Sequence, residues 1–187
     1  MIQEEVNKAV EVLRRGGIIL YPTDTVWGIG CDATNQEAVD RIYRLKGSAN
    51  KKGMIVLLDT PAAVGKYIRR VPEVAYDLME LTDKPLTLIL DGAVGVAPNL
   101  IPEEGSLAVR VPDHDFCRRV VGRLSRPLVS TSANFSGEPT PLKFSDIVEG
   151  IKEGVDMVIS PKFEGNPTRK ASSIMMIKES GEFKILR

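Results

Sequence analysis

The chain is poor in the residues on which many enzyme classes depend. Its 187 residues include one histidine, His114, and two cysteines, Cys31 and Cys117, whose spacing matches no zinc or redox motif. A single histidine argues against Cys–His and Ser–His–Asp catalysis and against a histidine-rich metal site, so we expect His114 to be structural. Two cysteines leave one disulfide open, although two reduced thiols are the expected state.

Net charge of one sign and long apolar runs are also missing. The 25 basic residues balance the 25 acidic ones, so nucleic acid or a membrane would bind only at a local patch. No apolar run approaches the roughly 18 residues of a membrane span. The N-terminal segment Met1–Glu5 lacks the charged and apolar regions of a signal peptide. We therefore expect a cytoplasmic protein without a membrane partner.

What the chain does contain is a regular alternation of helix and strand signals. We expect helices at 6–13, 35–46, 72–81, 114–124 and 145–152, the second capped by Thr34 and the fourth by Asp113. We expect strands at 18–21, 54–58, 86–90, 107–111, 127–129, 156–160, 173–178 and 183–186, with residues 22–33 as a loop. Such alternation favours an α/β domain over residues 1–187, and the short C-terminal spacings require a mixed sheet.

A stretch of small hydrogen-bonding residues, Ser130–Gly137, follows the apolar run at 127–129 directly. It supplies four hydroxyl groups and one amide, which suit an anionic, oxygen-rich ligand. Ligands of open α/β sheets bind beyond the carboxyl ends of strands, where this stretch is expected. A solvated serine- and asparagine-rich turn is the alternative interpretation, and the segment alone does not decide between them.

The segment Pro22–Gly30 leaves the first expected strand with two threonine hydroxyls, one carboxylate and a tryptophan. Its glycines, with Ala33, fit the dinucleotide-binding fingerprint in the alanine form. That motif requires the glycines immediately after the strand, whereas Pro22–Trp27 intervene here. Asp59 also lies too far along the chain to be the acidic partner, so we disfavour a dinucleotide site.

Two further features involve cations. Lys46, Lys51 and Lys52 flank a short loop that could clamp a nucleotide triphosphate, with a solvated surface loop as the alternative. Arg110 stands in an alternating strand between two valines, where a solvated side chain is not expected. A buried arginine needs a carboxylate or phosphate partner, from either a ligand or an internal salt bridge.

Taken in order, four segments resemble the YrdC-like family of threonylcarbamoyl-AMP synthases. They are Pro22–Gly30, Lys46 with Lys52–Val56, Ala108–Pro112 and Ser130–Gly137, and the resemblance runs from about residue 8 to the C-terminus. It implies a twisted mixed β-sheet with flanking helices around a large concave cavity, without the C-terminal extension of longer members. It also implies that L-threonine, bicarbonate and ATP react to threonylcarbamoyl-adenylate and pyrophosphate. The adenylate would pass to transferase proteins that modify tRNA.

The resemblance also implies roles for individual residues. Catalytic roles fall to Lys46, Lys52 and Arg110, and threonine binding falls to Thr25, Arg110 and Ser130. ATP binding falls to Ser48, Lys52, Ser106, Ser132, Asn134, Thr140, Ser172 and Arg187. Mg²⁺ would be held by the ATP phosphates, with no ligand from a protein side chain.

One departure from the family pattern bears on activity. The usual Lys-x-Arg appears here as Lys46-Gly47-Ser48, so a guanidinium expected on the phosphates is replaced by a hydroxyl. Loss of such a transition-state contact costs roughly 2–4 kcal/mol. Lys51 or Arg44 are candidate substitutes, although lysine lacks the planar fork of arginine. A catalytically divergent paralogue and a module binding double-stranded RNA or tRNA are therefore the alternatives to the enzyme.

Overall fold

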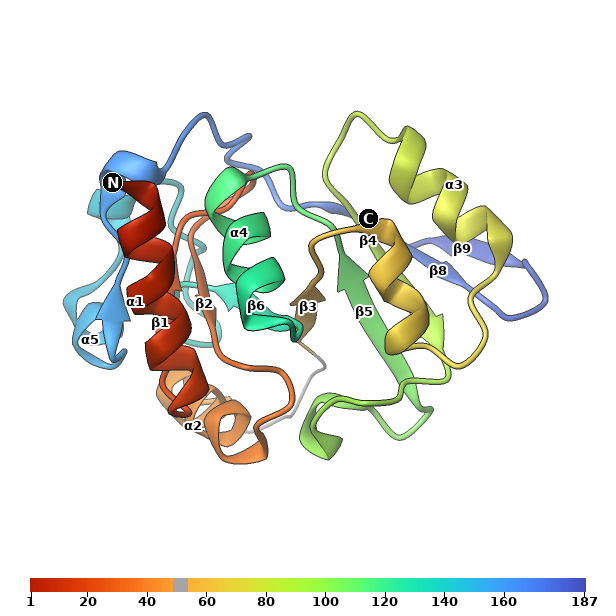
Figure 1. Ribbon diagram of the computed structural model, residues 1–187, viewed down its shortest axis with the longest axis horizontal. Coiled ribbons are helices and arrows are strands. Elements are labelled where there is room, and N and C mark those ends of the chain that lie inside the picture. The colour runs from red at the N-terminus through yellow and green to blue at the C-terminus, as the bar shows by residue number, and fades with distance from the viewer. Residues whose placement is uncertain (49–53) are drawn as a thin grey trace.

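A mixed β-sheet runs through the computed structural model, which describes residues 1–48 and 54–187 (Figure 1). Over those residues the strands are β1 Ile19–Tyr21, β2 Gly28–Gly30, β3 Ile55–Leu57, β4 Leu86–Asp91, β5 Ser106–Arg110, β6 Leu128–Ser132, β7 Met157–Val158, β8 Ser173–Ile177 and β9 Phe183–Ile185. Their order in the sheet is β7-β1-β2-β6-β3-β5-β4-β8-β9. The pairs β1–β7, β3–β5 and β4–β8 are parallel and the others are antiparallel, which confirms the expected mixed sheet.

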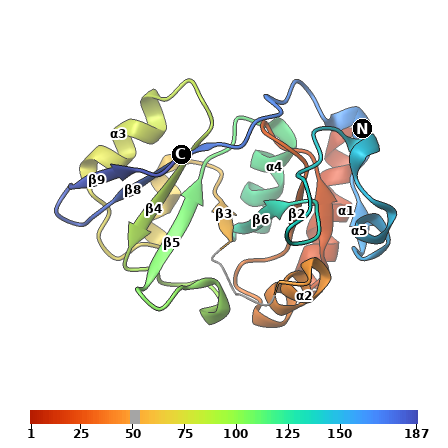
Figure 2. The ribbon, with the colours of Figure 1, turned by 180° about the vertical axis from the view of Figure 1, so that it is seen from behind.

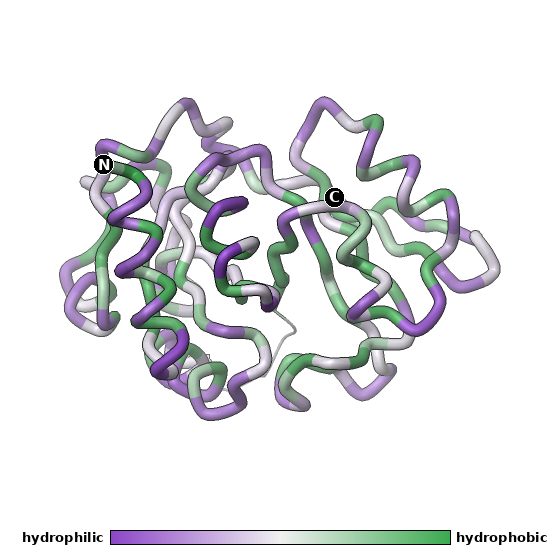
Figure 3. The backbone as a smooth tube through the Cα atoms, in the orientation of Figure 1, coloured by the Kyte–Doolittle hydropathy of each residue, from purple (hydrophilic) through white to green (hydrophobic). Residues whose placement is uncertain are grey.

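Helices cover the sheet unevenly. They are α1 Ile2–Arg14, α2 Gln36–Lys46, α3 Glu73–Leu81, α4 Asp115–Leu124 and α5 Glu149–Glu153, with short 3₁₀ helices η1 Pro61–Lys66, η2 Pro98–Leu100, η3 Phe144–Asp146 and η4 Pro161–Phe163. The tube of α1 and α4 alternates between hydrophilic and hydrophobic residues, as expected of helices with one buried face (Figure 3). Within the described residues, no helix has both the length and the apolar character needed to cross a bilayer.

The helices α1 and α4 pack together over one face of the sheet. Leu13 of α1 and Phe116 and Val120 of α4 form a fully buried cluster with Tyr21 and Leu128 from the strands. Burying side chains of this size stabilises the fold by about 1.5–3 kcal/mol each. This cluster therefore fixes the strand β1, which leads into the segment Pro22–Gly30, and the strand β6, which contains the start of the segment Ser130–Gly137.

The strands β4 and β5 are covered by helices on one face only. On the covered face Leu88 and Val109 belong to the core, whereas Thr87, Ala108 and Arg110 at alternating positions lie on the opposite face. Figure 1 shows η1 and α3 in front of these strands, and Figure 2 shows no helix over them from behind. The uncovered face is where a cavity forms.

Residues 22–33 are not the continuous loop that we expected, because Gly28–Gly30 form β2 between β1 and β6. A Cβ atom on Gly30 would lie 2.1 Å from the carbonyl oxygen of Val129, so this strand position accepts only glycine. The two glycines thus serve strand packing and form no phosphate-binding turn. Because these glycines lie within a strand, they cannot form the dinucleotide-binding turn that we had already disfavoured.

Two expected helix caps were wrong. Asn35 rather than Thr34 caps α2, because its side-chain oxygen accepts the Ala38 N–H at 3.1 Å. The N-cap of α4 is His114 and not Asp113, and its side chain makes no capping hydrogen bond. In both places several residues with capping propensity stand side by side, and the chain direction entering the helix selects among them.

Two element boundaries also differ from expectation. The helix expected at 145–152 is split into the 3₁₀ helix η3 and the single-turn helix α5. The strand expected at 127–129 continues to Ser132, so the first hydroxyl-bearing residues belong to β6 rather than to a turn. Backbone pairing of β6 with both β2 and β3 extends the strand beyond its apolar run.

Candidate active site

A cavity of about 450 Å³ lies on the uncovered face of the sheet. Nine of the expected site residues line it: Thr25, Lys46, Ser48, Arg110, Ser130, Ser132, Thr140, Ser172 and Arg187. They come from the β1–β2 connection, the end of α2, the strands β5 and β6, the segments that follow β6 and precede β8, and the C-terminus. Segments more than 160 residues apart along the chain therefore share one wall, from Thr25 to Arg187.

Three expected residues are not part of this wall as described. Ser106 begins β5, and its hydroxyl donates to the Glu104 carboxylate at 3.1 Å. The amide nitrogen of Asn134 donates to two backbone oxygens, those of Phe135 at 3.2 Å and Glu138 at 2.8 Å. Lys52 lies outside the described residues. Contacts of these three residues with ATP remain predictions.

The described residues of the wall have a positive charge balance. Lys46, Arg110 and Arg187 contribute cations, and no aspartate or glutamate is among the described lining residues. The chain as a whole has no net charge, so this positive charge is local. A concave site with charge of one sign raises the local concentration of oppositely charged ligands. The cavity is thus suited to an anion.

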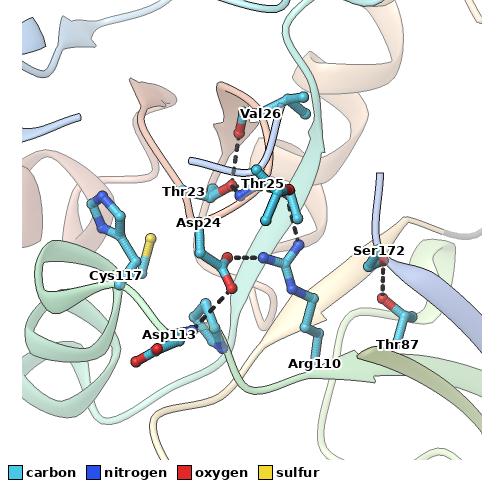
Figure 4. Close-up of polar contacts among 12 residues, drawn as sticks. Thr23, Asp24, Thr25, Val26, Thr87, Arg110, Asp113, Cys117 and Ser172 are labelled. Atoms are coloured by element: carbon cyan, nitrogen blue, oxygen red, sulfur yellow. Dashed lines mark hydrogen bonds and ion pairs between the residues drawn. The ribbon is translucent and has the colours of Figure 1, made fainter. Parts of the chain in front are cut away.

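Arg110 is nearly buried, with 4% of its surface exposed. Its Nη1 donates to the Thr25 hydroxyl at 3.0 Å, and its Nη2 forms an ion pair with Asp24 (Figure 4). Burial lowers the pKa of the guanidinium, which stays protonated at any physiological pH. Among the described residues its Nε has no hydrogen-bond partner. The internal salt bridge that we considered is therefore present. Nη1 and Nη2 each carry a second N–H besides the one used here, whereas Nε is buried.

Lys46 is the last residue of α2, and Gly47 ends the helix with a left-handed φ of 67°. The Lys46 ammonium donates to the backbone oxygens of Ser132 at 2.6 Å and Asn134 at 2.7 Å. Burial lowers its pKa to about 8. An ammonium has three donors, so one remains for a ligand while the other two hold the end of β6 in place.

One hydroxyl-bearing residue of the wall, Thr87, was missed by the sequence analysis. Thr87 of β4 is fully buried, and its hydroxyl lies 2.7 Å from that of Ser172. Thr87 is paired with Arg110 across the antiparallel β4–β5 ladder, so both side chains belong to the cavity face. Thr23 and Thr131 line the same wall. The available signal for Thr87 was a lone hydroxyl in the apolar strand 86–90.

Other candidate chemistry is absent from the wall. Cys31 and Cys117 are buried, form no disulfide, and have pKa values raised by burial, so neither is a reactive thiolate. Within residues 1–48 and 54–187, no three histidine, cysteine, aspartate or glutamate side chains gather as metal ligands would. Arg44 is exposed and is not a lining residue, and Lys51 lies outside the described residues.

Comparison with known proteins gives matches over nearly the whole chain. The family model Sua5/YciO/YrdC, described as "Telomere recombination", matches residues 11–187. The threonylcarbamoyl-AMP synthase of Pseudoalteromonas translucida is 31% identical over 167 residues, which are 88% of this chain and 89% of that protein.

Solved structures give the same result. P. abyssi Sua5, solved in complex with L-threonine, has a TM-score of 0.86 and 26% identity over 97% of this chain. This chain spans about half of that protein, at 53% of its length. E. coli YciO has a TM-score of 0.81 and 25% identity, with 99% of this chain and 89% of YciO covered. The match of the family model over residues 11–187 shows that the chain belongs to the Sua5/YciO/YrdC family.

Proposed function

We propose that the protein is a threonylcarbamoyl-AMP synthase, which makes threonylcarbamoyl-adenylate and pyrophosphate from L-threonine, bicarbonate and ATP. One observation carries the proposal. Arg110 and the serines of β6 face one cavity whose described wall has cations and hydroxyls but no carboxylate side chain. A relative 31% identical over most of this chain has this activity by name, and the matching Sua5 structure contains L-threonine.

The amino acid binds at the Arg110 end of the cavity. Its carboxylate accepts hydrogen bonds from the Arg110 guanidinium, whose Nε is unpartnered among the described residues. Thr25 holds the other edge of the guanidinium and also lines the cavity. The hydroxyls of Ser130, Thr87 and Ser172 lie on the same wall, where they can accept from the ammonium or hydroxyl of threonine.

ATP binds at the end of the cavity formed by α2 and the end of β6. The phosphates meet the Lys46 ammonium and the Ser132 hydroxyl, with Thr140 and Arg187 further along the wall. The carboxylates that Mg²⁺ prefers are absent from the described wall, so the ion fits this site only as part of the ATP substrate.

The chemistry needs alignment more than a strong base. The neutral threonine amine reacts with carbon dioxide, releasing a proton, or with bicarbonate, releasing water, to give a carbamate. A carbamate oxygen then attacks the α-phosphorus as the bond to pyrophosphate breaks. Positioning and electrostatic stabilisation dominate such phosphoryl and nucleotidyl transfers. Lys46 neutralises charge on the leaving pyrophosphate, and Arg110 holds the carbamate in line. A cytoplasmic transferase acting on tRNA would consume the adenylate.

The test is pyrophosphate release from ATP, measured with each substrate omitted in turn. Release that requires both L-threonine and bicarbonate supports the proposal. Absence of release at high enzyme concentration, with all three substrates present, contradicts it. Release with bicarbonate and a different amine would identify another carbamoyl acceptor. RNA binding that weakens with salt and survives Arg110→Ala would favour the RNA-binding alternative.

A further inference from the structure

Asp24 touches the Arg110 guanidinium but is absent from the wall of the ligand cavity. It lies in the β1–β2 connection between two cavity-lining threonines, and its side chain is 12% exposed. One carboxylate oxygen pairs with Arg110 Nη2, and the other accepts the backbone N–H of Asp113 at 3.1 Å. The carboxylate is therefore anchored from two separate segments and has little freedom to rotate.

Asp24 contacts the Arg110 guanidinium from outside the ligand cavity. Asp24 borders a second cavity of about 570 Å³, whereas Arg110 and Thr25 border the ligand cavity. Figure 4 shows Asp24 and Thr25 at separate nitrogen atoms of the guanidinium. Asp24 thus holds Arg110 without itself lining the cavity that Arg110 lines.

A buried guanidinium without a fixed partner is costly and poorly oriented. Arginine recognises a carboxylate through its planar fork, and an error of about 1 Å in that plane weakens both hydrogen bonds. The Asp24 carboxylate supplies the compensating charge, and together with Thr25 it fixes two of the three guanidinium nitrogens. The third nitrogen, Nε, is left without a partner among the described residues.

We propose that Asp24 is a positioning residue for the amino-acid substrate, holding the Arg110 guanidinium so that its unpaired donors face the substrate carboxylate. This inference rests on the proposed function, because it requires that the cavity bind an amino acid. It assigns Asp24 no contact with substrate and no part in the transfer of the nucleotide.

The experiment is calorimetric binding to Asp24→Asn, which keeps an oxygen for the Asp113 N–H and removes the charge. We expect the dissociation constant of L-threonine to rise at least tenfold and that of ATP to change less than twofold. L-Threoninol, which lacks the carboxylate, should bind the wild type and the variant equally weakly. The matched control is Asp113→Asn, which keeps the backbone N–H that contacts Asp24 and changes only a 93% exposed carboxylate paired with Arg118; it should bind threonine like the wild type.

A second variant keeps the proposal testable if the first is unstable. In Asp24→Ala, millimolar formate should restore threonine binding by occupying the space of the missing carboxylate. Threonine affinity of a folded Asp24→Asn within twofold of the wild type would overturn the role of Asp24. So would an equal loss of threonine and ATP binding, which marks a structural role. A wild-type protein that binds neither ligand would contradict the proposed function itself.

Discussion

At the scale of the residue, Arg110 is the group that we propose binds the carboxylate of the amino acid. Two flanking valines in a strand predicted from the sequence that its guanidinium is buried, and 4% exposure confirms this. The partner was not predictable, because Asp24 lies 86 positions away along the chain and only the folded sheet brings the two together. The burial of an arginine predicts that it has an anionic neighbour, but the local sequence does not identify which residue that neighbour is.

Replacing Arg110 by lysine should therefore weaken threonine binding while leaving ATP binding intact. Lysine keeps the positive charge beside Asp24 but lacks the planar fork. Loss of one charge-assisted hydrogen bond costs roughly 1.5–3 kcal/mol, or about 10- to 150-fold in affinity. Calorimetric titration with L-threonine measures the effect. Replacing the exposed Arg118 of α4 by lysine is the control, and an unchanged threonine affinity in Arg110→Lys would contradict the assigned role.

Lys46 makes the site sensitive to pH in the mildly alkaline range. Its pKa of about 8 in the folded protein means that the ammonium loses its charge as pH rises from 7 to 9.5. We expect ATP affinity to fall several-fold over that range, because the attraction to the phosphates disappears. Titration calorimetry at several pH values measures this fall. In Lys46→Met the ATP affinity should be weak and should not change with pH over the same range. A wild type whose ATP affinity is equally independent of pH would contradict the account.

The lowered pKa of Lys46 also makes the stability of the fold depend on pH. Stability rises with pH, whereas ATP affinity falls. Lysine has an ordinary pKa of 10.5, so between about pH 8 and 10.5 the unfolded chain binds more protons at this position than the folded one. The contribution of Lys46 to the free energy of unfolding therefore rises with pH across that window. Urea denaturation of the wild type and of Lys46→Met isolates this contribution, which should be absent from the variant.

At the scale of the element, long periodic segments were predictable and short irregular ones were not. The helices α1, α2, α3 and α4 were expected from their apolar spacing. The strand β2 escaped prediction because Gly-Ile-Gly has neither β-branched density nor alternation, and its place is set by close packing against β6. For the same reason the polar extension of β6 was mistaken for a turn, since pairing partners rather than propensity keep it extended.

Two glycine substitutions test this account of β2. Gly30→Ala should destabilise the protein by about 1–3 kcal/mol, because its Cβ would lie 2.1 Å from a carbonyl oxygen of the neighbouring strand. Gly122→Ala in α4 should stabilise it by about 0.5–1 kcal/mol, because the nearest atom lies 3.5 Å away and alanine favours the helix. Urea denaturation measures both, and equal effects would contradict the packing argument.

At the scale of the whole molecule, one sheet joins segments from β1 near the N-terminus to β9 near the C-terminus. The single domain that we expected over residues 1–187 remains a prediction, and the continuity of the sheet favours it. The overall charge is balanced and gave no hint of the cavity wall, whose described residues include three cationic side chains and no aspartate or glutamate. Composition averages over the surface, whereas a site depends on which few side chains converge.

Cooperative unfolding checks the single-domain prediction. The only tryptophan, Trp27, is buried beside β2, so its fluorescence reports on one half of the sheet. Far-ultraviolet circular dichroism reports on all helices and strands. Coincident urea transitions by the two probes are expected of one cooperative unit. Two separated transitions would show that the halves of the sheet unfold independently.

The central claim is that one cavity brings an amino acid, a carbon source and ATP together. The most direct measurement is mass spectrometry of the product formed from L-threonine, ATP and ¹³C-labelled bicarbonate. The account predicts a threonylcarbamoyl-adenylate that carries the label in its carbamoyl group and that, at limiting threonine, forms in strongly reduced yield in Arg110→Lys. Formation of unlabelled threonyl-adenylate, or of no adenylate at all, would contradict it.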